Sequence, residues 1–201
     1  MPHSEWERTV MRQNPARRTA LLDAAIEVLA REGSRGLTLR ALDTQAEVPK
    51  GTASNYFPHR AELLAQVMRR ILERLTPEDA ALADTMSEAP SMELVVTLLK
   101  QLVERTRADR SSHLALLELR LEATRRPELH AELTTFMTEQ LEANIDFHLG
   151  AHLPGDRTGV VLLYLAMLGL IVDDLTVPDL LAPFSTDKLI EELTRRVLRA
   201  V

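Results

Sequence analysis

Residues 37–63 constrain the fold of this chain most, because they hold two very short helical patterns in quick succession. The segment Glu47-Val48-Pro49 separates the two patterns. A helix this short is not stable alone in water, so neighbouring helices must hold both in place. The second pattern is rich in small hydrogen-bonding side chains and poor in apolar ones. This composition favours display to a polar partner over burial.

The residues before this stretch form an amphipathic helical pattern. Apolar side chains between Ala20 and Leu29 repeat with the 3.6-residue period of an α-helix. Pro15 suits the first turn of such a helix, whereas Gly33 and Gly36 are typical of its end. A first helix is therefore predicted from about Pro15 to the two glycines.

Three more helices are expected next. Thr38 is the predicted N-cap of the second helix, and Pro49 is expected at an early position of the third, which should run to about Asn55. A fourth, longer helix begins near Pro58 and should weaken or stop at Pro77. The predicted core of the first three helices consists of Ala25, Val28, Leu29, Leu39, Leu42, Ala46, Val48 and Phe57.

The rest of the chain is also helical in pattern. Further helices are predicted at residues 91–109, 112–125, 128–149, 156–174 and 186–199. No alternation of period two is long enough to predict a strand, and no repeat is visible. The fold class expected is all-α, with about nine helices.

Composition narrows the setting in which the chain works. It has no cysteine, which excludes disulfides and thiolate metal sites and suits a reducing cytoplasm. The first residues lack the apolar segment of a signal peptide. The longest apolar run, Val160 to Val172, is short for a bilayer and is better explained as a buried helix. We expect a soluble, cytoplasmic protein with no membrane partner.

Charge is distributed unevenly along the chain. Residues 1–75 carry 12 Lys or Arg against 9 Asp or Glu, whereas residues 76–201 carry 12 against 21. Only the first third is therefore suited to approach a polyanion, although the whole chain has a net charge of −6. This asymmetry indicates two functions on one chain.

The first three helices can form a small unit in which the second and third make a helix-turn-helix. In that motif the N-terminal residues of the later helix contact base edges in the major groove of double-stranded DNA. The predicted DNA contacts are Thr38, Arg40, Lys50, Gly51, Thr52, Ser54, Asn55, Tyr56, His59 and Arg60. A helical hairpin with a merely polar surface is the alternative, and Asn55 could instead face solvent.

This stretch resembles the DNA-binding signature of the tetracycline-repressor (TetR) family. The matching positions are Thr38, Lys50-Gly51-Thr52, Tyr56-Phe57, Arg60 and Leu63-Leu64. The likeness is close over about residues 17–75. Beyond them, residues 117–129 resemble one branch of the family's regulatory domains.

Two residues depart from the family pattern. Asp43 stands where a small packed residue is usual, so we expect its carboxylate to be hydrogen-bonded or partly exposed. Glu47 stands where glycine is common in the turn, and a positive φ there would cost about 1 kcal/mol.

The resemblance implies two domains: an N-terminal arm and helix-turn-helix over residues 1–57, and a helical ligand-binding and dimerisation domain over residues 58–201. It further implies a homodimeric repressor that leaves a palindromic operator when it binds a small apolar or amphipathic effector. A DNA-binding protein without a ligand is the alternative. The sequence shows none of the enzyme motifs sought, so catalysis is not expected.

Homodimer contacts are expected along the last two helices. Residues 159–172 are apolar on nearly all sides, so the helix must be covered on more than one face, either in a core or in an interface. Ala166 and Gly169 would allow close approach of a second helix. The predicted interface residues are Leu162, Ala166, Gly169, Leu170, Leu189, Leu193 and Val197.

The effector pocket is harder to predict, because Leu and Met at helical spacing also make ordinary cores. Candidate lining residues are Met68, Leu72, Leu102, His113, Leu117, Arg120, Leu121, Phe136, Gln140, Tyr164 and Met167. Arg120 could instead pair with Glu118 or Glu122. Only 3% of the residues are aromatic, which argues against a stacking cage for flat cations.

No cofactor and no metal are expected. His148 and His152 have a spacing that could hold a metal ion, but Gly150 between them is predicted to end the helix and spoil the geometry.

Overall fold

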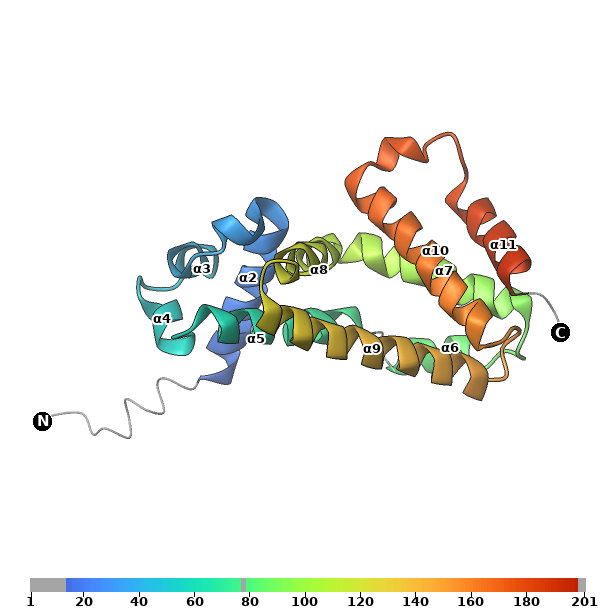
Figure 1. Cartoon of the computed structure of the whole chain (residues 1–201), viewed down its shortest axis with the longest axis horizontal. Helices are drawn as coiled ribbons and strands as arrows, with labels where there is room; N and C mark the ends of the chain where they lie inside the picture. The colour runs from blue at the N-terminus through green and yellow to red at the C-terminus, as the bar shows by residue number, and fades with distance from the viewer. Residues whose placement is uncertain (1–13, 77–78, 199–201) are drawn as a thin grey trace, which may run out of the picture. The chain divides into compact units, whose positions relative to one another are not determined.

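The computed structural model describes residues 14–76 and 79–198. Within these residues the chain forms ten α-helices and one short 3₁₀-helix, with no strand, which confirms the all-α prediction (Figure 1). In chain order the elements are α2 (Pro15–Gly36), α3 (Leu39–Gln45), α4 (Thr52–Tyr56), α5 (Arg60–Leu75), α6 (Asp79–Thr85), α7 (Met92–Ala108), α8 (Arg110–Ala123), α9 (Pro127–Gly150), α10 (Arg157–Thr176), η1 (Pro178–Leu180) and α11 (Thr186–Val197).

The chain divides into two compact units. As far as it is described, the first unit comprises residues 14–76 with 111–134, and the second comprises 79–110 with 135–198. Helix α5 packs against α2 and thus belongs to the first unit. The functional boundary after residue 57 is a different division and stays a prediction. The predicted N-terminal arm lies outside the described residues up to residue 13.

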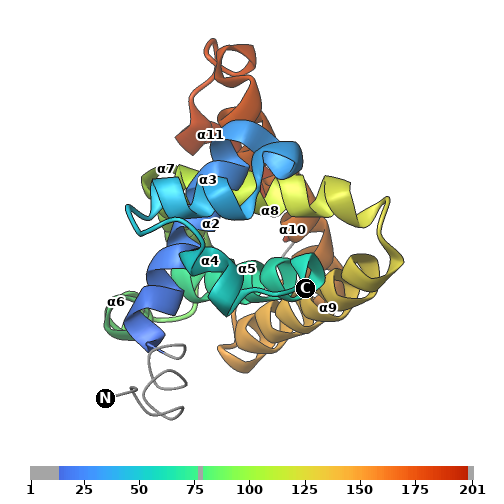
Figure 2. The ribbon, with the colours of Figure 1, turned by 90° about the vertical axis from the view of Figure 1, so that its left-hand side faces the viewer.

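The core of the first unit forms where α2 packs against α3 and α5. Its fully buried side chains include Leu21, Ala25, Ile26, Val28, Leu29, Leu42, Phe57, Leu64 and Ile71. Three residues expected in this core, Leu39, Ala46 and Val48, are only partly buried. Figure 2 views the unit with α3 and α4 toward the reader.

Helix ends follow local chemistry with one exception. Pro15 is the first residue of α2, and the Thr38 side chain caps α3 by accepting a hydrogen bond from the Ala41 amide at 3.1 Å. The expectation that Pro49 is an early residue of the third helix was wrong. The Pro49 carbonyl instead accepts the Thr52 amide in a turn, and Gly51 lies in the left-handed region at φ 85°, so α4 begins at Thr52.

The core of the second unit brings α7, α10 and α11 together. Its buried side chains are Leu94, Val95, Val103, Leu153, Leu163, Met167, Ile190 and Leu198. Two short elements, α6 and η1, were not predicted, because each is only a turn or two long and lacks a clear apolar period.

Helix α10 is apolar on both its buried and its outer faces. Leu163 and Met167 belong to the core, while Leu162 is 51% exposed and Leu165 is 55% exposed. By length and composition alone this helix could also cross a membrane, but the same composition is usual in a core or interface helix.

Candidate nucleic-acid interface

The turn between α3 and α4 has the geometry that the sequence suggested. The Ala46 amide donates to the Leu42 carbonyl at 2.9 Å and ends α3, and the Val48 amide donates to the Asp43 carbonyl at 3.0 Å. Between them Glu47 adopts φ 53°, in the left-handed region. A side chain there costs about 1 kcal/mol relative to an ordinary backbone conformation. The expectation of a strained Glu47 is confirmed.

Asp43 explains how a helix of five residues is held in place. Its side chain is only 4% exposed, and its two carboxylate oxygens accept the Gly51 and Ala53 amides, each at 2.7 Å. Gly51 is the N-cap of α4 and has no side chain that could cap it. The Asp43 carboxylate therefore caps α4 from the preceding helix, where it also meets the positive end of the helix dipole. The expected hydrogen bonding of Asp43 is confirmed.

The outer side of α4 presents polar groups in two different states. The Thr52 hydroxyl donates to the Pro49 carbonyl at 2.6 Å, and the Ser54 hydroxyl donates to the Gly51 carbonyl at 2.8 Å. Since each hydroxyl has one proton, both are left as acceptors unless these local bonds break. The exposed side chains of Lys50 and Asn55 make no hydrogen bond to any described residue, so their donors are free.

Tyr56 has a packing role that sequence analysis did not assign. Its side chain is 3% exposed, and the Arg18 guanidinium lies 5.6 Å from its ring centroid and 5.5 Å from that of Phe57. Arg18 also donates to the Gln66 side chain at 2.6 Å. These cation–π contacts join the end of α4 to α2. A phosphate contact by Tyr56 stays a prediction.

Arg60 is tied to the end of α2. Its guanidinium donates to the Leu37 and Ser34 carbonyls, each at 2.6 Å, and to the Ser34 hydroxyl at 3.1 Å. A cation is well placed at the C-terminal carbonyls of a helix. A phosphate contact by Arg60 stays a prediction, but it would share a guanidinium that already holds three acceptors. His59 is exposed and caps α5 without a side-chain bond.

Carboxylates of α8 reinforce the same corner of the first unit. The Ser34 amide donates to the Glu118 carboxylate at 3.1 Å, and Glu122 pairs with Arg126. The hydrogen bond from Arg126 is the main reason why the pKa of Glu122 lies below its ordinary value. Neither carboxylate makes the ion pair with Arg120 that was the alternative to its ligand role.

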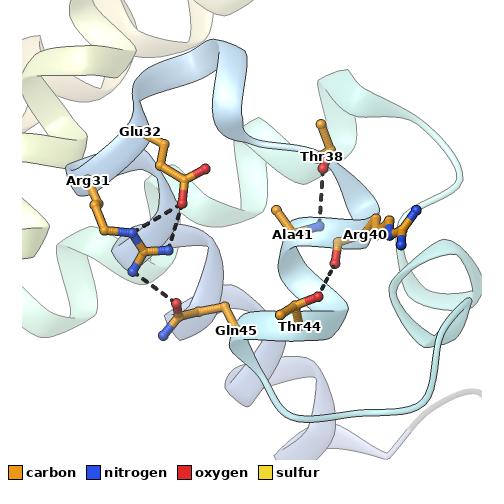
Figure 3. A pocket seen from close by; sticks show the side chains of 7 residues that line it. All are labelled: Arg31, Glu32, Thr38, Arg40, Ala41, Thr44 and Gln45. Atoms are coloured by element: carbon orange, nitrogen blue, oxygen red, sulfur yellow. Dashed lines mark hydrogen bonds and ion pairs between the residues drawn. The ribbon is translucent and has the colours of Figure 1, made fainter.

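A shallow hollow lies beside α3 and includes two predicted DNA contacts, Thr38 and Arg40 (Figure 3). Its lining residues are Arg31, Glu32, Thr38, Arg40, Ala41, Thr44 and Gln45. Arg31 is held by Glu32 at 2.8 Å and by Gln45 at 3.1 Å, whereas the Arg40 side chain points away from the other labelled side chains. Arg40 thus offers an exposed cation next to the α3 N-terminus.

The residues predicted to line a ligand pocket are divided between the units. Met68, Leu72, His113, Leu117, Arg120 and Leu121 belong to the first unit, and Leu102, Phe136, Gln140, Tyr164 and Met167 belong to the second. Met68 and Met167 are buried in the cores of their own units, whereas Leu121 is 56% exposed. The pocket stays a prediction.

The residues predicted for the dimer interface fall into two groups. Leu162 is exposed and Gly169 faces open space, whereas Leu170, Leu193 and Val197 partly pack against the core of the second unit. Leu189 and Ala166 are partly buried. The exposed Leu165 was missed, although its spacing of three residues after Leu162 and four before Gly169 places it on the same helical face.

The histidine pair has ordinary structural surroundings. Helix α9 ends at Gly150, a ring nitrogen of His148 lies 2.8 Å from the Pro154 carbonyl, and His152 adopts φ 54° in the following turn. Within the described ranges no group of three or more potential metal ligands comes together.

Comparisons with known proteins cover both parts of the chain. The family model described as "Bacterial regulatory proteins, tetR family" matches residues 21–67, and "Tetracyclin repressor-like, C-terminal domain" matches residues 90–201. The chain is 29% identical over 142 residues to the HTH-type transcriptional regulator BetI of Rhizobium meliloti (strain 1021), which is 71% of this chain and 68% of that protein.

Two solved structures have a similar fold over nearly the whole chain. A TetR-family member from Streptomyces coelicolor A3 is 26% identical, with a TM-score of 0.67 and coverage of 92% of this chain and 100% of that one. The multidrug binding protein EbrR complexed with ethidium is 25% identical, with a TM-score of 0.65 and coverage of 92% and 99%.

Proposed function

Because the chain belongs to the TetR family of DNA-binding transcriptional regulators with a ligand-binding C-terminal domain, we propose that it is a homodimeric repressor of a palindromic operator. A small-molecule effector releases it from the DNA. The observation that carries this proposal is the preformed α4, which Asp43 caps from behind while Lys50 and Asn55 project unpaired donors.

The donors divide into two kinds of contact. Lys50 is a point charge that suits a phosphate, whereas the Asn55 amide can both donate to and accept from an adenine edge. Thr52 and Ser54, whose protons are used locally, act first as acceptors from base amino groups. Lys50 thus supplies affinity for any DNA, and Asn55 supplies sequence preference.

The dimer forms through the outer face of α10, with α11 beside it. Leu162 and Leu165 expose apolar surface there, and Gly169 leaves room for a second helix to approach. Two copies related by a two-fold axis present two α4 helices to successive major grooves, about 34–36 Å apart or slightly more.

The effector binds more tightly to the dimer conformation in which the two α4 helices do not fit the operator. It is a small apolar or amphipathic molecule, as the Leu- and Met-rich candidate lining residues suggest. EbrR binds ethidium. We do not extend that ligand to this chain, because its four Phe, two Tyr and one Trp offer little stacking surface. As a regulator that binds DNA, the protein is proposed to work in the cytoplasm and to need no cofactor.

The test is selection of the DNA that the full-length protein binds, followed by gel-shift titration on the selected site. Lys50→Ala should weaken binding to all sequences and lower the salt dependence, with a slope reduced by about one. Asn55→Ala should cost about 1–3 kcal/mol on the selected site and relax preference at one position. Lys188→Ala, an exposed lysine on α11, is the matched control. Failure to select any sequence would contradict the proposal.

A further inference from the structure

Helix α7 carries three cationic side chains, and two of them are neutralised within the second unit. Lys100 Nζ lies 2.7 Å from a Glu191 carboxylate oxygen, and Arg107 pairs with Asp174 at 2.6 Å. Arg105 differs from both. Its Nε atom is buried without a hydrogen-bond partner, and its guanidinium forms no ion pair with any residue in the described ranges.

Arg105 also lies on a different face of α7. At about 100° per residue it is roughly 140° around the helix from Lys100 and 200° from Arg107, nearly opposite both. It shares its face with Leu98 and Leu102, which lie about two turns and one turn earlier in the chain, and both leucines pack partly against the core of the second unit. This face therefore combines an apolar strip with an unpaired cation at its C-terminal end.

A partly buried cation without a counter-charge destabilises the folded protein. Burial lowers the pKa of Arg105 below its ordinary value, with no neighbouring charge to oppose the shift. Buried polar groups in folded proteins nearly always have a partner, so an unpaired one indicates a partner outside the described residues, which we take to be a bound molecule. The planar, forked guanidinium matches the two oxygens of a carboxylate or a phosphate.

We infer that Arg105 binds the anionic group of an amphipathic ligand, a carboxylate or a phosphate, whose apolar part lies along Leu98 and Leu102. That this ligand is the effector rests on the proposed function. Anion binding at Arg105 does not depend on DNA binding. A cationic ligand is disfavoured at the same position, because its charge would face the guanidinium.

The first test needs no ligand and uses the thermal unfolding of the full-length protein. Arg105→Gln should unfold at the same temperature as the unchanged protein or a few degrees higher, because it removes an uncompensated charge. Arg107→Gln, on the opposite face of the same helix, should unfold at a slightly lower temperature because it loses the Asp174 pair. A larger drop for Arg105→Gln than for Arg107→Gln would show that the chain itself satisfies Arg105, and it would overturn the inference.

The second test measures binding by calorimetry with four probes that share one alkyl chain: octanoate, octyl phosphate, octanol and octyltrimethylammonium. At least one of the two anions should bind, and the tighter one identifies the headgroup. Arg105→Gln should weaken that binding about tenfold or more, while Arg107→Gln leaves it unchanged. Equal binding of octanol or of the cation, failure of both anions to bind, or unchanged binding to Arg105→Gln would each overturn the inference.

The same anion is then added to a gel shift with the selected operator. Release of the operator supports both the anion site and its role as effector site. If the anion binds through Arg105 and the operator affinity stays the same, the effector role fails and the anion site stands. If the anion does not bind, the inference fails while selection of an operator still supports the DNA-binding proposal.

Discussion

Asp43 in the first unit and Arg105 in the second are both charged side chains with buried atoms, and they are treated in opposite ways. Both Asp43 oxygens accept backbone amides at 2.7 Å, whereas the buried Arg105 Nε has no partner among the described residues. The difference separates two kinds of binding region. In the first unit the buried carboxylate of Asp43 fixes α4, whose exposed side chains are the proposed DNA contacts. In the second unit the buried Nε of Arg105 has no partner among the described residues, and this is why we propose that it binds an anion.

The largest effect should come from disrupting the exposed apolar face of α10 in the second unit. The proposed dimer forms through this face and brings two copies of α4 to the DNA. Leu165→Asp should separate the proposed homodimer and weaken operator binding by on the order of 100-fold or more, because one head alone loses the second contact. Light scattering after size exclusion gives the mass. Phe184→Asp, equally exposed but outside α10, is the control and should stay dimeric. A dimeric Leu165→Asp would place the interface elsewhere.

The next largest effect should come from removing the Asp43 carboxylate, which accepts two backbone amides. Asp43→Ala leaves the Gly51 and Ala53 amides without their acceptor and should lower the free energy of unfolding by about 3 kcal/mol. Operator binding should fall with it, since α4 loses its cap. Asp43→Asn keeps one acceptor oxygen and should lose roughly half as much. Urea unfolding beside gel shift measures both, and a fully stable Asp43→Ala would remove the contrast with Arg105.

A substitution at Arg60 tests whether this side chain only stabilises the end of α2 or also contacts DNA. Arg60→Ala removes three hydrogen bonds to Ser34 and Leu37 and should cost about 2 kcal/mol of unfolding free energy. If Arg60 only braces α2, the dependence of DNA binding on salt should keep its slope. A slope reduced by about one would reveal the phosphate contact that the sequence suggested.

The smallest effect should come from the strained turn. Glu47→Gly relieves a left-handed backbone conformation of about 1 kcal/mol but gives the unfolded chain more freedom, so the net gain should stay below about 1 kcal/mol. Denaturant midpoints of the two proteins measure it. Ala46→Gly, at an ordinary negative φ of −85°, is the control and should be destabilising. A destabilised Glu47→Gly would mean that the Glu47 side chain makes a compensating contribution.

Much of the fold could be predicted because helical patterns can be recognised in short stretches of sequence. The long helices of the second unit begin and end within a few residues of their predicted bounds, since apolar period, Pro and Gly act over one or two turns. The start of α4 could not be predicted in this way. Pro49 is compatible with a first helical turn, but the structure places it in a turn before Gly51, where the carboxylate of Asp43, eight residues earlier in the chain, accepts the amides at the later start.

The sequence by itself determined the all-α class, the Thr38 cap and the polar character of α4, because these depend on neighbours within a turn or two. Tertiary structure alone decided which charged side chains form hydrogen bonds or ion pairs and which do not. Arg60 meets Ser34 across 26 residues, Arg18 meets Gln66 across 48, and Lys100 meets Glu191 across 91. Helical periodicity cannot specify such meetings, since they depend on how separate helices pack. For the same reason the free donors of Lys50 and Asn55 and the unpaired guanidinium of Arg105 became visible only once every other partner had been placed.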